Sequence, residues 1–219
     1  MDKTASSFGS ALILAGGRGS RIGCDKKTLR LNGESVMISL VNRLGALFDE
    51  VIVSSNNEFE HENVLVLKDE IGAGPLAGIY QGLKHCKSEY LYVIACDMPF
   101  TSSAYINFIK DKIERGGGPQ KYDVCAAQKD DGFLEPFNAF YGKGCLQTVR
   151  AALESGVYKI QPVLKKLRLC IIQSGELAEN CPQSALFFNI NYKTDLQEAE
   201  TLLQSLGDSS IIKREFNSF

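Results

Sequence analysis

The chain has 219 residues, which suits one α/β domain with a substantial core and is short for two domains of ordinary size. Its composition is that of a globular protein, and the formal net charge of −2 argues against a general binder of nucleic acid or of membrane surfaces. No apolar run is long enough to cross a bilayer and the opening MDKTASSFGS is polar, so we expect a cytoplasmic protein without a secretory signal.

A buried strand is predicted over residues 11–15, and a glycine-rich loop follows it. The loop combines glycines with cations: Gly16, Gly17, Gly19, Gly23, Arg18, Arg21, Lys26 and Lys27. Glycine lets backbone N–H groups approach an anion closely, and the cations indicate an anion with several charges. The pattern predicts a diphosphate or triphosphate site at the carboxyl end of this strand. A purely structural glycine turn is the alternative.

Two familiar glycine loops do not fit this stretch. A P-loop needs Gly-Lys-Ser/Thr, whereas Lys26 follows Asp25. A dinucleotide loop needs a third glycine where Ile22 stands, and Gly23 comes one residue late.

Helix and strand patterns then alternate along the chain. We expect helices over residues 35–47, 75–86 and 102–113, and strands over residues 51–53, 64–67 and 90–95, the last of them central. The second of these strands is followed by Asp69, and a glycine loop with Gly72 and Gly74 then leads to Pro75, which suits the first turn of a helix. This loop permits close backbone approach to a ligand.

Asp97 follows the predicted central strand directly. A single carboxylate at the end of a buried strand, opposite a cationic phosphate loop, predicts Mg²⁺ between Asp97 and a triphosphate. The alternative is that Asp97 caps the next helix, for which Ser102 or Ser103 is better placed.

The second half predicts a hairpin-like pair of strands over residues 123–128 and 134–141, with Glu135 on the second. Helices over 145–153 and 160–167, an edge strand over 169–172, a strand over 185–191 and a helix over 194–206 complete the pattern. Asn189 and Asn191 would face one side of their strand. The fold class expected is α/β: a three-layer α/β/α sandwich with a mainly parallel, Rossmann-like sheet and one antiparallel strand. We expect residues 1–10 to be a flexible leader, 11–206 a single domain and 207–219 a C-terminal tail.

The seven cysteines form no C-x-x-C pair, and His61 and His85 lack the spacing of zinc ligands. We therefore expect free thiols in a reducing compartment, and neither a zinc site nor histidine-based acid–base catalysis. The expected chemistry is electrostatic and uses cations, backbone amides and a metal ion.

Four stretches resemble, in order, the motifs of nucleotidyltransferases that join a nucleoside triphosphate to a phosphorylated acceptor. They are L-A-G-G-x(2)-S-R-I-G-x-D-K, G-x-G-P-L-A-G-I, C-D-M-P-F and F-x-N-x-N. Asp25-Lys26 is similar to the molybdenum cofactor guanylyltransferase branch (the molybdopterin-guanine dinucleotide biosynthesis protein A family). The resemblance covers roughly residues 10–206 and implies a nucleotide-diphospho-sugar transferase-like fold.

The resemblance implies transfer of GMP from GTP to molybdopterin, with Mg²⁺, giving molybdopterin guanine dinucleotide and pyrophosphate. It implies catalytic roles for Arg21, Lys26 and Asp97, with Asp97 as the metal ligand. The nucleotide-binding residues it implies are Leu14, Ala15, Gly16, Gly17, Lys26, Asn56, Asp69, Gly74, Pro75, Leu76 and Asp97. Acceptor-binding residues are Glu135, Asn189 and Asn191. Transient contacts with other cofactor-maturation proteins or target molybdoenzymes follow from the same resemblance, and neither nucleic acid nor membrane is an expected partner.

Ser54 departs from this branch, which often has asparagine there, and Asn56 is a candidate replacement. The base therefore stays open at this point: a cytidylyl- or uridylyltransferase acting on molybdopterin or on a sugar or alcohol phosphate is the alternative. A non-catalytic nucleotide-binding partner is a third hypothesis, which loss of Asp97 or Lys26 would have favoured.

Overall fold

The computed structural model describes residues 6–15, 29–180 and 183–205. Within these residues a seven-stranded sheet has the strand order β5-β4-β1-β6-β8-β7-β9. The strands are β1 (Ser10–Leu14), β4 (Glu50–Ser54), β5 (Val64–Leu67), β6 (Tyr90–Ala95), β7 (Val124–Ala127), β8 (Ala139–Gly142) and β9 (Leu169–Ile172). A small hairpin of β2 (Arg30–Leu31) and β3 (Glu34–Ser35) stands apart from the sheet.

The sheet is parallel apart from β8, the one strand of the described sheet that runs antiparallel to both of its neighbours, β6 and β7. The strand β6 is the fourth of seven and therefore central. The predicted fold class is confirmed, including its single antiparallel strand and the edge position of β9.

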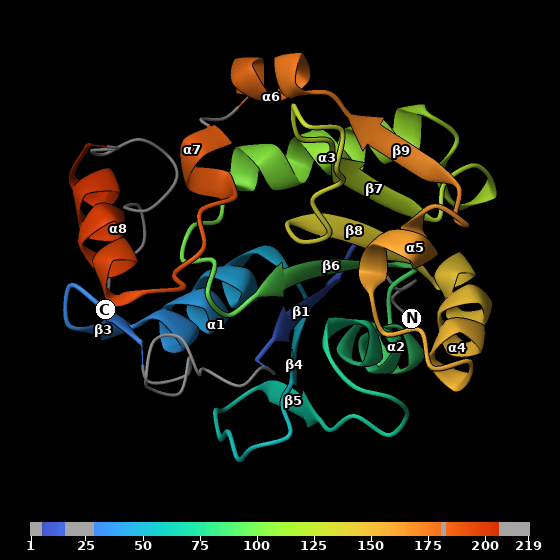
Figure 1. Cartoon of the computed structure of the whole chain (residues 1–219), viewed down its shortest axis with the longest axis horizontal. Helices are drawn as coiled ribbons and strands as arrows, with labels where there is room; N and C mark the ends of the chain where they lie inside the picture. The colour runs from blue at the N-terminus through green and yellow to red at the C-terminus, as the bar shows by residue number, and fades with distance from the viewer. Residues whose placement is uncertain (1–5, 16–28, 181–182, 206–219) are drawn as a thin grey trace, which may run out of the picture.

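Helices cover both faces of the sheet (Figure 1). One face carries α1 (Val36–Leu47), α3 (Ser103–Arg115), α6 (Ser174–Asn180), α7 (Gln183–Leu186) and α8 (Lys193–Ser205). The other carries α2 (Pro75–His85), α4 (Leu146–Glu154) and α5 (Ile160–Leu164). Short 3₁₀ turns occupy Gly118–Gln120 and Lys143–Cys145.

The first strand divides its side chains between the two layers of core. Ala11 and Ile13 pack in the core under α1 and α3, whereas Leu12 and Leu14 pack in the core under α2 and α4. All five residues of β1 are buried. Strands buried on both faces read as continuous apolar runs, which is why this one was recognisable in the sequence.

The helix starts follow local chemistry. The Oγ of Ser35 accepts a hydrogen bond from the N–H of Ile38 (3.4 Å), and the Oγ of Ser102 accepts one from the N–H of Tyr105 (3.2 Å). Pro75 opens α2 directly after Gly74, whose φ of 76° lies in the left-handed region that favours glycine. Ser102 therefore caps α3, and Asp97 is left for another role.

Two predicted strands are wrong or too long. The segment 134–138 makes only one isolated bridge, Gln128 to Leu134, before β8 begins at Ala139. Pro136 has no N–H for a ladder, and the φ of 50° at Asn138 interrupts the extended backbone. Glu135 accordingly lies in a loop.

The second error concerns residues 185–191, which form the end of α7 and an irregular segment. The N–H of Ile190 donates to the carbonyl of Asp97 (2.9 Å), a residue beyond the end of β6. A single such bond past the end of a strand is no ladder, so Asn189 and Asn191 do not lie on a strand.

Phe8 is buried and stacks on Tyr90, with 5.2 Å between the ring centroids, so the packed domain extends upstream of residue 11. The division into leader, domain and tail otherwise stays a prediction, because residues 1–5 and 206–219 lie outside the described residues.

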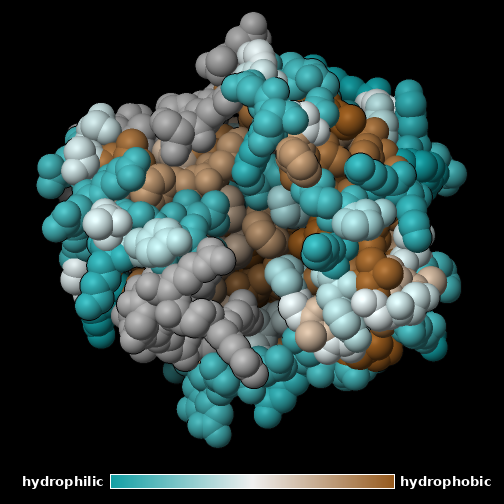
Figure 2. All heavy atoms as spheres, viewed as in Figure 1, coloured by the Kyte–Doolittle hydropathy of each residue, from teal (hydrophilic) through white to brown (hydrophobic). Residues whose placement is uncertain are grey.

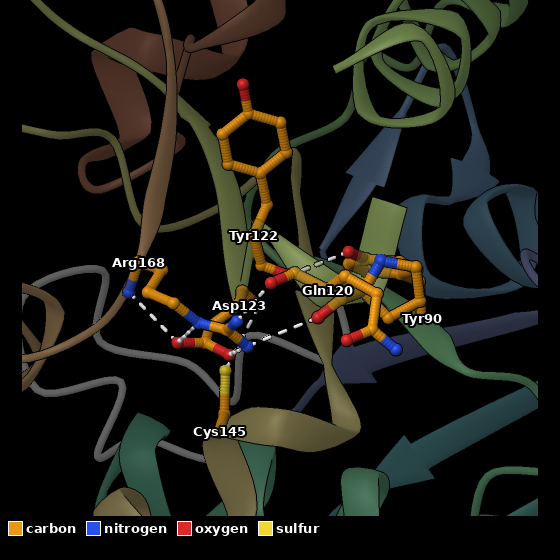
Figure 3. A network of polar contacts seen from close by, with 7 residues as sticks. Tyr90, Gln120, Tyr122, Asp123, Cys145 and Arg168 are labelled. Carbon is orange, nitrogen blue, oxygen red and sulfur yellow. Dashed lines mark hydrogen bonds and ion pairs between the residues drawn. The ribbon is translucent and has the colours of Figure 1, made fainter. Parts of the chain in front are cut away.

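An ion pair ties the amino ends of β7 and β9 together (Figure 3). Arg168 donates through Nη2 and Nε to both carboxylate oxygens of Asp123 (2.6 and 3.0 Å), and its backbone N–H donates to the same carboxylate (2.9 Å). Arg168 also reaches the carbonyl of Gln120 (2.5 Å), and the thiol of Cys145 donates to the carbonyl of Asp123 (3.2 Å). The hydrogen bonds from Arg168 lower the pKa of Asp123, which is buried.

We expect Asp123→Asn to lower the free energy of unfolding by about 2 kcal/mol at pH 7, because charged hydrogen bonds to Arg168 become neutral or are lost. A carboxyl whose pKa is lower in the folded state stabilises the fold above its unfolded pKa of about 4. The difference between wild type and variant therefore shrinks as the pH falls through the lowered folded pKa. Urea denaturation between pH 7 and pH 3 measures it.

The matched control is Asp111→Asn, which breaks an exposed pair with Arg115 (3.6 Å). This change should cost less than about 1 kcal/mol at any pH. A cost for Asp123→Asn that is no larger, or that persists undiminished at pH 3, contradicts the account.

Candidate functional site

The carboxyl ends of four parallel strands meet at one edge of the sheet. Backbone hydrogen bonds continue past the strand ends: Ala15 N–H to Ser54 O (2.9 Å), Ser55 N–H to Leu67 O (2.9 Å) and Cys96 N–H to Leu14 O (3.1 Å). Residues that directly follow β1, β4, β5 and β6 are therefore neighbours in space. In the view of Figure 1, the surface has a hollow near its centre with hydrophobic atoms beside it (Figure 2).

Asp69 is held by two residues from the end of β4. The amide of Asn56 forms a reciprocal pair with it: Nδ2 donates to Asp69 Oδ2, and the N–H of Asp69 donates to Asn56 Oδ1, both at 3.1 Å. The hydroxyl of Ser54 donates to Asp69 Oδ1 (3.4 Å). Each carboxylate oxygen has two lone pairs, so this oriented carboxylate keeps capacity for further donors. The predicted residues Asn56 and Asp69 thus belong to one cluster.

The first turns of α2 lie directly on the ends of β1 and β4. A Cβ on Gly78 would stand 2.6 Å from Leu14 Cδ2 and 2.6 Å from Ser54 Oγ. The structure therefore brings the Gly74–Leu76 stretch to the same edge as the Asp69 cluster. The side chains of Leu14 and Leu76 are buried in the core under α2, so these two predicted residues can offer only their backbone to a ligand.

Asp97 lies just past β6 and is 7% exposed. Its loop is fixed from two sides: the N–H of Ile190 donates to the Asp97 carbonyl, and Arg43 Nη2 on α1 donates to the carbonyl of Pro99 (2.5 Å). Burial lowers the pKa of Arg43 to about 10, which still leaves it charged at neutral pH. The carboxylate therefore sits on a well-anchored loop.

Asn189 and Asn191 flank Ile190, which is fully buried. The Nδ2 of Asn189 donates to the carbonyl of Phe187 (2.9 Å), and the N–H of Asn191 donates to Asp195 Oδ2 (2.7 Å). Both asparagines are partly exposed. The structure therefore brings this pair next to the Asp97 loop without the predicted strand.

Glu135 lies in the loop between β7 and β8 and is only 3% exposed. Its Oε2 pairs with Lys129 Nζ at 2.7 Å, and its Oε1 accepts from the N–H of Phe137 (3.4 Å). These contacts show a residue that orders its own loop, and contact with an acceptor stays a prediction.

Four of the predicted residues, Gly16, Gly17, Arg21 and Lys26, lie outside the described residues. Their stretch connects β1 to Leu29, which is buried again. Their roles stay predictions.

Two polar residues near this edge, the half-buried Arg43 and the buried Asn138, escaped the sequence analysis. Arg43 lies seven residues after Val36 on its helix, and Asn138 interrupts the apolar run that ends in β8. A polar residue in a run otherwise destined for the core is the signal that would have found both.

No group of three or more His, Cys, Asp or Glu side chains in the described part of the chain is arranged to hold a metal ion. Mg²⁺ needs no such cage, since it commonly takes one or two carboxylates together with phosphate oxygens and water. The carboxylate of Asp97, which is buried at the end of β6, fits that kind of site. Cys86, Cys96, Cys125, Cys145 and Cys170, the cysteines for which the structure gives a state, are free and buried, as expected.

Among the described helices, none is both long and apolar enough to cross a bilayer.

An open parallel sheet with glycine turns and oriented carboxylates at its carboxyl edge defines the nucleotide-binding class of α/β domains. Residues 11–170 match the family described as "MobA-like NTP transferase domain", and the chain belongs to this family.

Similar proteins carry names that are consistent with this family. The chain is 36% identical over 201 residues to a "Probable molybdenum cofactor guanylyltransferase" of Peptoclostridium acidaminophilum, covering 90% of each chain. It is 34% identical over 194 residues to the "Molybdenum cofactor guanylyltransferase" of Syntrophotalea carbinolica, covering 87% of this chain and 90% of the relative.

Solved structures share the fold. Molybdopterin-guanine dinucleotide biosynthesis protein A from Archaeoglobus fulgidus superposes with a TM-score of 0.77 at 25% identity, over 90% of this chain and 99% of that one. The 2-C-methyl-D-erythritol 4-phosphate cytidylyltransferase of Thermus thermophilus superposes with a TM-score of 0.62 at 16% identity, over 89% and 98%. The second likeness concerns the fold alone.

The close contact at Gly78 gives a test of this edge. We expect Gly78→Ala to lower the free energy of unfolding by about 1–3 kcal/mol, because the new methyl group forces α2 away from β1 and β4. Gly45→Ala is the control: Gly45 lies within α1 and a Cβ there meets open space, so this change should stabilise by about 0.5–1 kcal/mol. Urea denaturation compares the two, and equal effects would refute the packing argument.

Proposed function

We propose that this protein transfers GMP from GTP to molybdopterin, forming the guanine dinucleotide of the cofactor and pyrophosphate. The observation that carries the proposal is the gathering at one sheet edge of three separate motifs, represented by Asp69, Asp97 and the Asn189–Asn191 pair. The names of the relatives support the same substrates.

The Asp69 cluster is the proposed reader of the base. A carboxylate accepts hydrogen bonds from N1–H and the 2-amino group of guanine together, an arrangement that cytosine and uracil do not offer. Asn56 and Ser54 hold Asp69 through both of its oxygens, so the orientation of the carboxylate is set before the nucleotide arrives. Backbone groups of Leu14–Gly17 and of Gly74–Leu76 would contact the rest of the nucleoside.

Asp97, Arg21 and Lys26 are the proposed phosphate end of the site. Asp97 would hold Mg²⁺, which when bound neutralises charge on the triphosphate. Arg21 and Lys26 would neutralise the α-phosphate and the departing pyrophosphate. Transfer of this kind depends on positioning and charge stabilisation.

The acceptor would approach from the side of Asn189 and Asn191, with Glu135 in the neighbouring loop. Its terminal phosphate is already a nucleophile, so in-line attack on the α-phosphorus requires no protein base. No histidine is among the residues predicted for this site, and the proposed reaction does not need one as a base. A maturation enzyme of this type would work in the cytoplasm and hand its product on through transient contacts with other maturation proteins or target molybdoenzymes.

Thermal melting with Mg²⁺ and GTP, CTP, UTP or ATP tests the base. A ligand at about a hundred times its Kd stabilises the fold by roughly 2.7 kcal/mol, which raises Tm by several degrees. We expect GTP alone to give this rise, and Asp69→Ala to abolish it.

Selective stabilisation by CTP or UTP would move the protein to the alternative of a cytidylyl- or uridylyltransferase, for which serine at position 54 is the motivating observation. No response to any nucleotide would contradict the proposed site.

Asp97→Asn tests catalysis. We expect pyrophosphate release from GTP and molybdopterin to fall on the order of a hundredfold, because charge stabilisation of the reacting phosphate is lost. Asp130→Asn, an exposed change in the β7–β8 turn, should leave the rate unaltered. Nucleotide-induced stabilisation without pyrophosphate release by the wild type would instead indicate a non-catalytic nucleotide-binding partner.

A further inference from the structure

A buried asparagine connects the central strand to the segment that carries the paired asparagines. Asn138 is fully buried and lies just before β8. The hydroxyl of Tyr92 on β6 donates to its Oδ1, and its Nδ2 donates to the carbonyl of Leu186, the last residue of α7. The side chain of Asn138 therefore connects a residue 46 positions before it with one 48 positions after it.

The chemistry of the partners fixes the direction of this amide. The carbonyl of Leu186 can only accept, so the NH₂ group of Asn138 must face it. The oxygen of the amide then faces Tyr92, whose hydroxyl must donate. The two bonds are mutually dependent, and removing the Tyr92 hydroxyl leaves a buried acceptor unpaired.

The segment beyond Leu186 is attached at further points. Phe187 meets the ring of Tyr105 edge-on at 6.1 Å, and Phe188 meets the ring of Phe100 at 6.0 Å. The last attachment is the hydrogen bond from the N–H of Ile190 to the carbonyl of Asp97. The segment from Leu186 to Ile190 is thus held at both ends, by Asn138 at one and by Asp97 at the other. Asn189 lies within this segment.

The backbone at position 138 restricts the choice of residue. Its φ of 50° is in the left-handed region, which asparagine tolerates better than most residues and glycine adopts freely. Glycine would keep the turn and lose both side-chain bonds. Asparagine, unlike glycine, both tolerates the left-handed backbone of the turn and forms the two side-chain hydrogen bonds.

We propose that Asn138 is a positioning residue, which sets where Asn189 and Asn191 stand relative to Asp97 and thereby how the phosphorylated acceptor is bound. The proposal rests on the function proposed above, because it takes the two asparagines as acceptor contacts. Asn138 acts through Leu186 and touches no substrate. Its loss should therefore weaken acceptor binding and leave the nucleotide cluster around Asp69 unaffected.

Two variants remove the bridge in different ways: Asn138→Gly, which keeps the backbone conformation, and Tyr92→Phe, which keeps the ring. We expect each to raise KM for molybdopterin about tenfold, the loss of one buried hydrogen bond, with KM for GTP changed less than about twofold. Exchange of the Ile190 amide hydrogen with solvent should quicken by a similar factor, because its segment is less firmly held.

The matched control is Tyr90→Phe, which removes a hydroxyl from the same strand. Tyr90 donates to the carbonyl of Tyr122 (2.7 Å) at the other end of β6, away from Asp97. This variant should lower Tm without altering either KM or the exchange of Ile190. A merely structural role for Asn138 would make the three variants alike.

The inference is overturned if Ile190 exchange is unchanged in both test variants, or if KM for GTP rises as much as KM for molybdopterin. Failure of the proposed function is a different result, in which the wild-type protein itself releases no pyrophosphate from GTP and molybdopterin. The exchange measurement does not depend on activity, so the two failures are distinguishable.

Discussion

The rest of the structure depends on the burial of β1 between β4 and β6. Parallel pairing on both sides satisfies its backbone, and the alternation of its side chains between two cores holds helices against both faces. Because its neighbours run the same way, their carboxyl ends meet at one edge. Asp69 and Asp97 follow the neighbouring strands β5 and β6, and Ile190, between the paired asparagines, is bonded to the carbonyl of Asp97.

Much of this arrangement is legible in the sequence. Fully buried strands are apolar runs, helices begin at Ser35, Pro75 and Ser102 with the expected chemistry, and polar residues that follow such strands must meet at one edge. Asp69, Asn56 and Asp97 could therefore be placed together without coordinates. The structure adds the hydrogen bond from Asn56 to Asp69. These residues follow two adjacent strands, and no local sequence pattern encodes a contact between them.

The misread segments share a physical cause. Residues 134–138 and 185–191 are rich in apolar residues and look like strands, but apolar residues only indicate burial. Whether it joins a ladder depends on available partners, on Pro136 and on the left-handed backbone at Asn138. Phe187 and Phe188 are apolar because they pack on Tyr105 and Phe100. Aromatic packing, the side-chain bond from Asn138 to Leu186 and the backbone bond from Ile190 to Asp97 hold this segment where a strand was expected.

The irregular segment found in place of the expected strand has a consequence for function. A strand in the sheet would have fixed Asn189 and Asn191 through many cooperative backbone bonds, insensitive to any one side chain. An irregular segment fixed at a few points responds to each of them, and one point is the carbonyl of Asp97 itself. The proposed metal ligand and the proposed acceptor contacts are therefore parts of one connected unit, whose alignment depends on Arg43 from α1 and on Asn138 from the loop before β8. The Asp69 cluster, which is the proposed base contact, is held by other strands and other bonds, so the proposed contacts to the base and to the acceptor are structurally separate.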